Sequence, residues 1–260
     1  MGRIIAIANQ KGGVGKTTTA GALIAGLSVE GFKVLGIDLD PQGNLSNSFG
    51  AEMYQKPTVY ELLKNEATAG EVVQYIQRFY IIPSNIMLAG AEQELTQTGK
   101  EHRLKETVLP IAGGYDYIVI DTPPSLGILT INAFTFADEV IIPTTAGIFA
   151  ANGIYQLNNT VKNVRKYCNP NIEVAGILLT RFNPRSNISK QLKELTEQLG
   201  KHIDAPIYET FIRNGIIVEE AQASHLDIFT YSGKSSVTED YRAFIKEYLK
   251  GAGKDGEAKI

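Results

Sequence analysis

The chain has 260 residues, of which 43% are hydrophobic and 20% charged, and its formal net charge is −3. This length suffices for one α/β domain with a substantial core, and the weakly acidic balance argues against indiscriminate binding of nucleic acid over the whole surface. The single cysteine, Cys168, excludes an internal disulfide, a CxxC redox pair and a metal site built from two cysteines. No apolar run reaches the roughly 20 residues that a membrane-spanning helix needs. We therefore expect a protein of the reducing cytoplasm without a membrane partner.

Five short segments are apolar throughout, which is typical of parallel strands that are buried on both faces. They are Ile4–Ala8, Val34–Ile37, Tyr117–Ile120, Val140–Ile142 and Val174–Leu179. Between and after them lie helical patterns: an amphipathic segment over 17–30, a capping box at Thr58 and Glu61, and apolar stripes over 154–164, 188–199 and 241–249. This alternation predicts an α/β fold with a doubly wound, mostly parallel sheet and helices on both faces. We expect one domain over residues 1–250 and a disordered tail over 251–260.

A glycine-rich loop follows the first predicted strand. Residues 11–19 read KGGVGKTTT and end like a phosphate-binding loop, although Gln10 stands where the usual G-x-x-x-x-G-K-[ST] pattern has glycine. Backbone N–H groups of such a loop converge on a phosphate, and the positive end of the following helix adds to the attraction. Lys16 would supply charge to the terminal phosphates, and the Thr17 hydroxyl would ligate Mg²⁺. The predicted nucleotide-binding residues of this loop are Gly12, Gly13, Val14, Gly15, Lys16, Thr17 and Thr18.

Three aspartates follow apolar strands. Asp38 and Asp40 come at the end of the second predicted strand, and Asp121 ends the strand Tyr117–Ile120 like a Walker B element. The carboxyl ends of parallel strands meet at one edge of a sheet, so these carboxylates are expected beside the phosphate loop. One of the first pair would face the metal shell and the other an attacking water, while Asp121 would hold Mg²⁺ through water.

Positive charge is concentrated in one part of the chain. Residues 160–201 hold eight basic and three acidic residues, which gives this segment a net charge of +5 and leaves −8 for the remainder. This distribution is consistent with a local anion-binding face, and equally with the solvated surface of helices. Cys168 is interpreted as a small buried residue. The three histidines, which show no ligand spacing, are interpreted as surface or packing residues; they are His102, His202 and His225.

Taken together, KGGVGKTTT, DLDPQGN and IVIDTPPSLGILTINAF closely resemble the ParA/Soj family of partition ATPases, within the deviant Walker A (MinD/ParA) class of P-loop NTPases. The resemblance covers most of the chain and implies ATP and Mg²⁺ as cofactors. It implies a sandwich homodimer in which Lys11 reaches the phosphates held by the other subunit. Asp40 would activate the hydrolytic water, with Lys11 and Lys16 as the other catalytic residues. Asp38 would then lie nearer the metal. The implied surroundings of the adenine are Thr180, Phe211 and Arg213.

The function that the resemblance implies is ATP-dependent DNA segregation by a cytoplasmic, nucleoid-associated protein. The ATP-bound dimer would bind DNA non-specifically and leave it after hydrolysis stimulated by a ParB-like centromere-binding partner. The candidate DNA contacts are Arg185, Lys190, Lys193 and Lys234. Two segments depart from the family pattern: Glu219 stands where relatives often carry a basic residue, and residues 143–149 replace a more polar sequence. Because DNA binding depends on neutralising phosphates, Glu219 should weaken that contact.

Two alternatives to a segregation ATPase stay open. A MinD-like membrane-surface positioning ATPase would need an amphipathic anchor at its C-terminus. Residues 241–250 are amphipathic but have balanced charges, and residues 251–260 have no apolar face, so packing on the core is the better interpretation of this helix. A small-molecule kinase is the second alternative. A reductase like the nitrogenase iron protein is excluded, since this chain has one cysteine.

Overall fold

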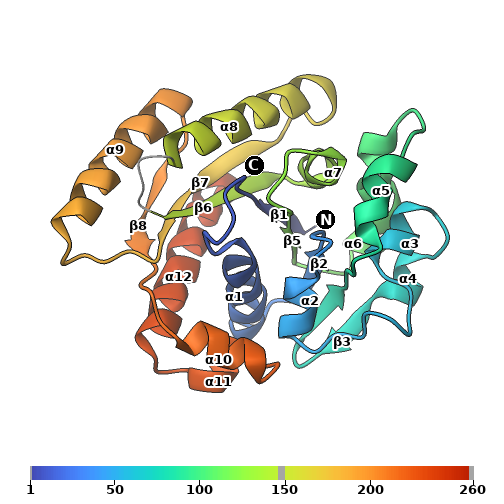
Figure 1. Ribbon diagram of the computed structural model, residues 1–260, viewed down its shortest axis with the longest axis horizontal. Coiled ribbons are helices and arrows are strands. Elements are labelled where there is room, and N and C mark those ends of the chain that lie inside the picture. The colour runs from blue at the N-terminus through green and yellow to red at the C-terminus, as the bar shows by residue number, and fades with distance from the viewer. Residues whose placement is uncertain (1, 146–149, 258–260) are drawn as a thin grey trace.

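An eight-stranded sheet in the order β3-β4-β2-β5-β1-β6-β7-β8 forms the centre of the molecule (Figure 1). The computed structural model describes residues 2–145 and 150–257. Neighbouring strands are parallel, except that β3 pairs with β4 in antiparallel fashion at one edge. The strands are β1 (Arg3–Ile7), β2 (Val34–Asp38), β3 (Gln74–Ile76), β4 (Phe79–Ile82), β5 (Tyr117–Asp121), β6 (Glu139–Thr145), β7 (Glu173–Thr180) and β8 (Ile207–Phe211). The predicted fold class is confirmed.

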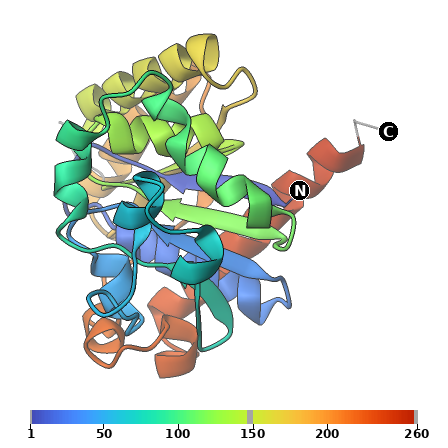
Figure 2. The same cartoon turned by 90° about the vertical axis from the view of Figure 1, so that its right-hand side faces the viewer.

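Helices cover both faces of this sheet (Figures 1 and 2). One face carries α1 (Lys16–Val29), α2 (Asn44–Ser48), α10 (Ile217–Ala223), α11 (Ile228–Ser232) and α12 (Ser236–Glu257). The other carries α3 (Val59–Leu63), α4 (Ala69–Val72), α5 (Leu88–Glu94), α6 (Arg103–Ala112), α7 (Ile128–Phe136), α8 (Ala150–Tyr167) and α9 (Asn187–Ile203), with the short 3₁₀ helix η1 (Lys100–His102) beside α7. Successive side chains of β1 enter the two cores in turn, as strand geometry requires: Ile4 on one face and Ile5 on the other.

The strand register brings the predicted site segments to one edge of the sheet. β5 lies between β1 and β2, and Asp121 is paired with Ile7 on one side and with Asp38 on the other. The glycine-rich loop leaves the sheet directly after Ile7, so it starts beside both aspartates. The carboxyl edge of three parallel strands therefore holds the loop and two carboxylates, which is where ligands bind in open α/β sheets.

The five strands expected from apolar runs are present as β1, β2, β5, β6 and β7. Three further strands carry weaker sequence signals. β3 and β4 have only three and four residues, and β8 is a half-buried edge strand interrupted by Glu209. The capping box of α3 is confirmed, since the Thr58 hydroxyl accepts from Tyr60 N at 3.3 Å and Glu61 accepts from Thr58 N at 2.7 Å.

The last helix is longer than the sequence suggested. We expected the ordered domain to end at residue 250, whereas α12 continues to Glu257 and projects beyond the body of the molecule (Figure 2). The expected disordered tail thus overlaps this helix over residues 251–257, and its last part, residues 258–260, lies outside the described residues. Among the helices that the structure describes, none combines the length and the apolar character required to span a bilayer.

Candidate functional site: a phosphate-binding loop with three carboxylates

The loop between β1 and α1 leaves the N-terminus of α1 open to a ligand. Gly13 and Gly15 have φ of +71° and +84°, a region that residues with a Cβ rarely adopt, so these glycines permit the turn. Gly15 is the N-cap of α1 and provides no side chain to cap the first backbone N–H groups. Those N–H groups, together with the positive end of the helix, form a ready site for a phosphate.

A cavity of about 480 Å³ lies over this loop. Its lining comes from the loop, from the segment after β2, and from three later positions. The lining residues are Gly12, Gly13, Gly15, Lys16, Thr17, Thr18, Asp40, Gln42, Asn44, Asn47, Ser48, Pro124, Arg181 and Gln222. Val14, the remaining predicted loop residue, is buried beneath the loop and does not line this cavity. Four amide residues of this lining were not among the predicted site residues: Gln42 and Asn44, which belong to the DLDPQGN motif, and Asn47 and Gln222, which belong to none.

Asp38 and Asp121 lie side by side but differ in their hydrogen bonds. One Asp38 oxygen accepts from the backbone N–H and the hydroxyl of Ser46, at 2.8 and 2.7 Å, and the other accepts from Asp40 N at 3.1 Å. Asp38 therefore fixes the segment between β2 and α2. Neither oxygen of Asp121 has a hydrogen bond of normal geometry among the described residues, although this side chain is fully buried; the Thr17 hydroxyl is a donor close enough to lower its pKa. Of the two carboxylates, Asp121 is the one left available for a cation.

The electrostatics of the site agree with this division. Burial raises the pKa of Asp38 to about 6, and the hydrogen bonds from Ser46 and Asp40 oppose that rise. Burial also raises the pKa of Asp121 well above its usual range, and the neighbouring charges of Asp38 and Asp40 add to it, while Thr17 and Lys16 oppose it. A buried, unpartnered carboxylate beside the Thr17 hydroxyl is a donor set of hard oxygens, so these residues fit a Mg²⁺ ion.

The two lysines of the loop occupy different environments. Lys16 is buried, its Nζ lies 3.4 Å from the Lys11 carbonyl oxygen, and burial lowers its pKa against the charges of Asp121 and Asp40. Lys11 is exposed, and its Nζ contacts Thr145 Oγ1 at 3.4 Å. Lys16 thus lines the cavity, whereas Lys11 does not line it and is exposed beside Thr145. Asp40 lines the same cavity, and one of its oxygens accepts from Gln42 N at 3.0 Å.

A second cavity of about 210 Å³ adjoins the first and shares Gly15, Thr18, Arg181 and Gln222 with it. Two of the residues expected near adenine line it. Thr180 donates through its hydroxyl to the Val14 carbonyl at 2.7 Å, and Arg213 is held by Asp240 through hydrogen bonds of 2.8 and 2.7 Å. Phe211 does not line this cavity: its ring packs against Phe182 with a centroid distance of 4.8 Å.

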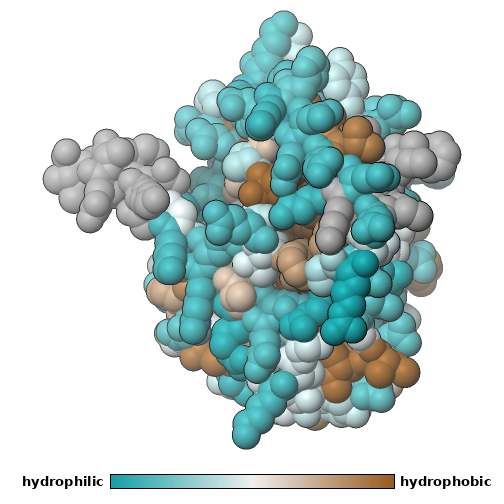
Figure 3. Space-filling model, turned by 90° about the vertical axis from the view of Figure 1, so that its left-hand side faces the viewer, coloured by the Kyte–Doolittle hydropathy of each residue, from teal (hydrophilic) through white to brown (hydrophobic). Residues whose placement is uncertain are grey.

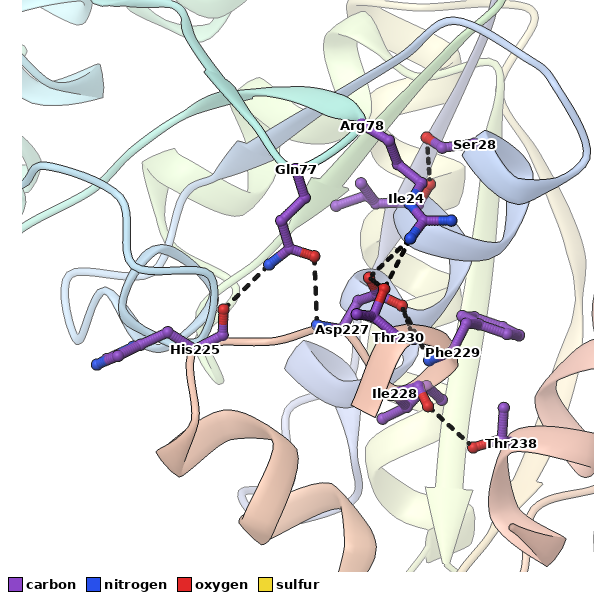
Figure 4. A network of polar contacts seen from close by, with 10 residues as sticks. All are labelled: Ile24, Ser28, Gln77, Arg78, His225, Asp227, Ile228, Phe229, Thr230 and Thr238. Carbon is purple, nitrogen blue, oxygen red and sulfur yellow. Dashed lines mark hydrogen bonds and ion pairs between the residues drawn. The ribbon is translucent and has the colours of Figure 1, made fainter. Parts of the chain in front are cut away.

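The segment that follows α10, together with α11, is hydrogen-bonded to the turn between β3 and β4 (Figure 4). Gln77 donates to the His225 carbonyl at 3.0 Å, and Arg78 donates to Thr230 Oγ1 at 2.7 Å. Asp227, the N-cap of α11, accepts from the N–H of Phe229 and Thr230. On the other side, His225 Nδ1 lies 2.7 Å from the Asn47 carbonyl oxygen, next to the phosphate cavity. The contacts of Gln77, Arg78 and His225 join residues 148 to 178 positions apart, so no local pattern indicates them.

The candidate DNA contacts do not form part of this cavity. Arg185 and Lys234 are exposed. The Lys193 Nζ lies 3.8 Å from Glu197 Oε1, one helical turn further along α9, and forms an ion pair with it. Lys190 belongs to α9, and its side chain lies outside the described residues. Glu219, the acidic departure noted in the sequence, lines the smaller cavity with Arg181 and Arg213.

The fold and this loop define a P-loop nucleotide-binding protein of the α/β class. Residues 2–174 match the family model described as an AAA domain. The chain is 41% identical over 251 residues to sporulation initiation inhibitor protein Soj of Bacillus subtilis, covering 95% of this chain and 98% of Soj. It is 39% identical over 254 residues to chromosome partitioning protein ParA of Myxococcus xanthus, covering 96% and 89%. The chain therefore belongs to the Soj/ParA family.

Solved structures agree with this assignment. Cobyrinic acid a,c-diamide synthase from Mycobacterium smegmatis with bound ADP and magnesium has a TM-score of 0.84 and 32% identity, over 96% of this chain and 95% of that chain. The ATP complex of a McdA variant from Cyanothece has a TM-score of 0.85 and 26% identity, over 96% of each chain. The nucleotides and magnesium in these structures agree with the ligands expected from the sequence.

Proposed function

We propose that this protein is a Mg²⁺-dependent ATPase that segregates DNA. The observation that carries the proposal is the fully buried Asp121 carboxylate, which has no hydrogen bond of normal geometry among the described residues and lies near Thr17, Lys16 and Asp40 at the open N-terminus of α1. Chromosome partitioning protein ParA of Myxococcus xanthus is 39% identical to this chain and the Mycobacterium smegmatis synthase 32%, which favours partition over the synthase activity.

The loop, two carboxylates and the adjoining cavity have separate roles in hydrolysis. The loop N–H groups hold the β-phosphate, and Lys16 neutralises the oxygens of the transferred phosphoryl group. Thr17 and Asp121 would hold Mg²⁺, which neutralises charge on the phosphates. Asp40 accepts a hydrogen bond from the attacking water and orients it toward the γ-phosphorus, whose bond to the β,γ-bridging oxygen breaks to release ADP. Thr180 and Arg213 border the base, with Phe211 supporting them from behind the cavity.

The exposed position of Lys11 supports a role in a homodimer. Lys16 already supplies positive charge inside the cavity, whereas Lys11 is exposed and does not line the cavity of its own chain, so its side chain is available to a nucleotide bound by a second copy. The γ-phosphate adds negative charge that ADP lacks, so a cation from the partner would bind the triphosphate state more strongly. The dimer would then form with ATP and separate after hydrolysis. The protein would thus alternate between a dimeric and a monomeric state, and the bound nucleotide would determine which state is favoured.

DNA binding and its release complete the proposal. The side of the molecule that carries α9 is mainly hydrophilic (Figure 3), and Arg185, Lys193 and Lys234 supply exposed or partly exposed positive charge for phosphates. A ParB-like centromere-binding partner would stimulate hydrolysis and so release the dimer from DNA. The protein would accordingly work in the cytoplasm on the nucleoid.

Light scattering with ATP, ADP or no nucleotide tests the central step, in an Asp40→Ala background that blocks turnover. We expect dimers with Mg²⁺-ATP and monomers with ADP. Lys11→Ala should stay monomeric with ATP while binding it within a few-fold of the parent affinity, and Lys56→Ala, a second exposed lysine, should dimerise like the parent. Dimers of Lys11→Ala equal to those of the parent would show that Lys11 does not join the subunits. A DNA-retention assay under the same three conditions tests the DNA-binding state.

A further inference from the structure

Three metal-ligating side chains of different chemistry meet outside the nucleotide cavity. They are Glu101 and His102 at the end of η1, and Cys168 directly after α8. One ligand atom of each lies within 4.8 Å of the other two: a carboxylate oxygen, an imidazole nitrogen and the thiol sulfur. All three residues are partly exposed, so an ion from solution can reach them. None of them lines the nucleotide cavity.

Buried asparagines hold both ligand-bearing segments on the same helix, α7. Asn132 donates to the Lys100 carbonyl at 2.8 Å and accepts from Leu104 N at 3.0 Å, which fixes η1 and the start of α6. Asn169, the residue after Cys168, donates to two backbone carbonyls at the C-terminal end of α7, at 2.9 and 2.6 Å. The backbones that carry the three ligands are therefore positioned independently of any ion, which lowers the ordering cost of binding one.

We propose that Glu101, His102 and Cys168 form a binding site for a divalent transition metal, with Zn²⁺ as the best match. Sulfur, nitrogen and oxygen donors together suit Zn²⁺, whereas Mg²⁺ takes oxygen ligands. Bonds of about 2.0–2.3 Å in a tetrahedral site place the donor atoms roughly 3.3–3.8 Å apart. The observed spacing thus has to close by about 1 Å, which side-chain rotation of partly exposed residues supplies. Water would fill the fourth position.

Sequence reading missed this site because its ligands have no motif spacing. His102 and Cys168 are 66 positions apart, and each alone reads as an ordinary packing residue. The fold brings them together by placing η1 and the end of α8 on α7. Binding Zn²⁺ releases the thiol proton to solvent and connects these two segments, so the ion would stabilise the folded chain.

Cobalt substitution tests the site cleanly, because Cys168 is the only cysteine in the chain. The full chain, freed of metal and nucleotide, is titrated with Co²⁺. We expect one equivalent to produce a thiolate-to-cobalt charge-transfer band that Zn²⁺ then removes. Cys168→Ser should abolish the band, and His102→Gln should weaken Co²⁺ binding about tenfold or more. His202→Gln, which changes an exposed histidine of α9, should leave both unchanged.

Alkylation of Cys168 by iodoacetamide gives a second readout that needs no Cys168 variant. Zn²⁺ should slow the reaction at least several-fold in the parent protein and in His202→Gln, and have no effect in Glu101→Gln or His102→Gln. Three results would each overturn the proposal. The first is Co²⁺ binding without a charge-transfer band, and the second is a band that His102→Gln retains with unchanged Co²⁺ affinity. The third is a rate of Cys168 alkylation in the parent protein that Zn²⁺ does not change. All of these measurements are independent of ATP hydrolysis, so they separate this site from the nucleotide site.

Discussion

Replacing Asp121 with asparagine should make the nucleotide-free protein more stable while it loses Mg²⁺-dependent nucleotide binding. The wild-type carboxylate is buried, has no hydrogen bond of normal geometry among the described residues, and lies beside Asp38 and Asp40, whose charges, together with burial, outweigh the influence of Thr17 and Lys16 on its pKa. A buried polar group without a partner costs about 1–3 kcal/mol, and a charged one more. The asparagine amide keeps part of that cost, since its own N–H groups need partners. We therefore expect a gain of about 1–2 kcal/mol in the free energy of unfolding, or a Tm higher by roughly 2–8 °C for a chain of this size.

The effect should depend on pH in a defined direction. The pKa of Asp121 is raised in the folded protein, so the folded state binds this proton more tightly than the unfolded state does. Ionisation therefore lowers stability as pH rises above the unfolded value of about 3.9, and the loss is complete above the folded pKa. Asp121→Asn removes that loss. Its stabilising effect should be larger at pH 8 than at pH 5.

Urea unfolding without nucleotide or Mg²⁺, at pH 5 and pH 8, measures both effects. Asp38→Asn is the matched comparison, because this carboxylate accepts two hydrogen bonds from Ser46 and one from Asp40. The substitution weakens these bonds, and it also removes a negative charge beside Asp121. After correction for the removed repulsion, we expect a lower free energy of unfolding than in the wild type. Added Mg²⁺-ATP should raise the midpoint of the wild type and have little effect on Asp121→Asn. If the unfolding midpoint of Asp121→Asn at pH 8 lies at a lower urea concentration than that of the wild type, the Asp121 carboxylate does not destabilise the nucleotide-free protein, and the argument for its role fails.

Other changes address the remaining parts of the site. Lys16→Ala should reduce ATP affinity at least a hundredfold in a fluorescent-nucleotide titration, and near-normal affinity would contradict the loop assignment. Asp40→Ala should bind ATP but release phosphate about 10²–10⁴-fold more slowly, within the range for general-base catalysis; unchanged turnover would remove it from the mechanism. The double variant Arg185→Glu with Lys234→Glu should lose DNA retention but still dimerise. Thr58→Ala should cost about 1 kcal/mol in thermal unfolding by removing the capping box, and no change in Tm would show the cap to be redundant.

The sequence predicted the central sheet and the phosphate loop because each depends on a local pattern. An apolar run such as Val34–Ile37 has to be covered on both faces, and Gly15 followed by Lys16 at a helix start has few other uses. Short edge strands such as β3 depend on the neighbour that they pair with, so their sequences alone are weak signals.

The difference between Asp38 and Asp121 could not be predicted in the same way. Both are aspartates that end buried strands, and the sequence treats them alike. They diverge because Ser46 lies eight residues after Asp38 and folds back onto it with two short hydrogen bonds, while Asp121 has no hydrogen bond of normal geometry among the described residues. The amide of Gln222 likewise reaches the phosphate cavity only through the docking of α10.

The nucleotide cavity draws on both ends of the chain, which has a consequence for synthesis. A growing polypeptide that has emerged through β6 already contains the glycine loop and all three carboxylates. It still lacks Arg213 and most of the other residues that line the smaller cavity, where the base is expected. The lining of that cavity includes Val237 and Tyr241 of α12, so it is complete only when α12 packs on α1, where the Tyr241 hydroxyl lies 3.3 Å from Thr19 Oγ1. A chain that has emerged only through β6 therefore has no complete pocket for the whole nucleotide, and the segment up to Tyr241 has to follow before the pocket is complete.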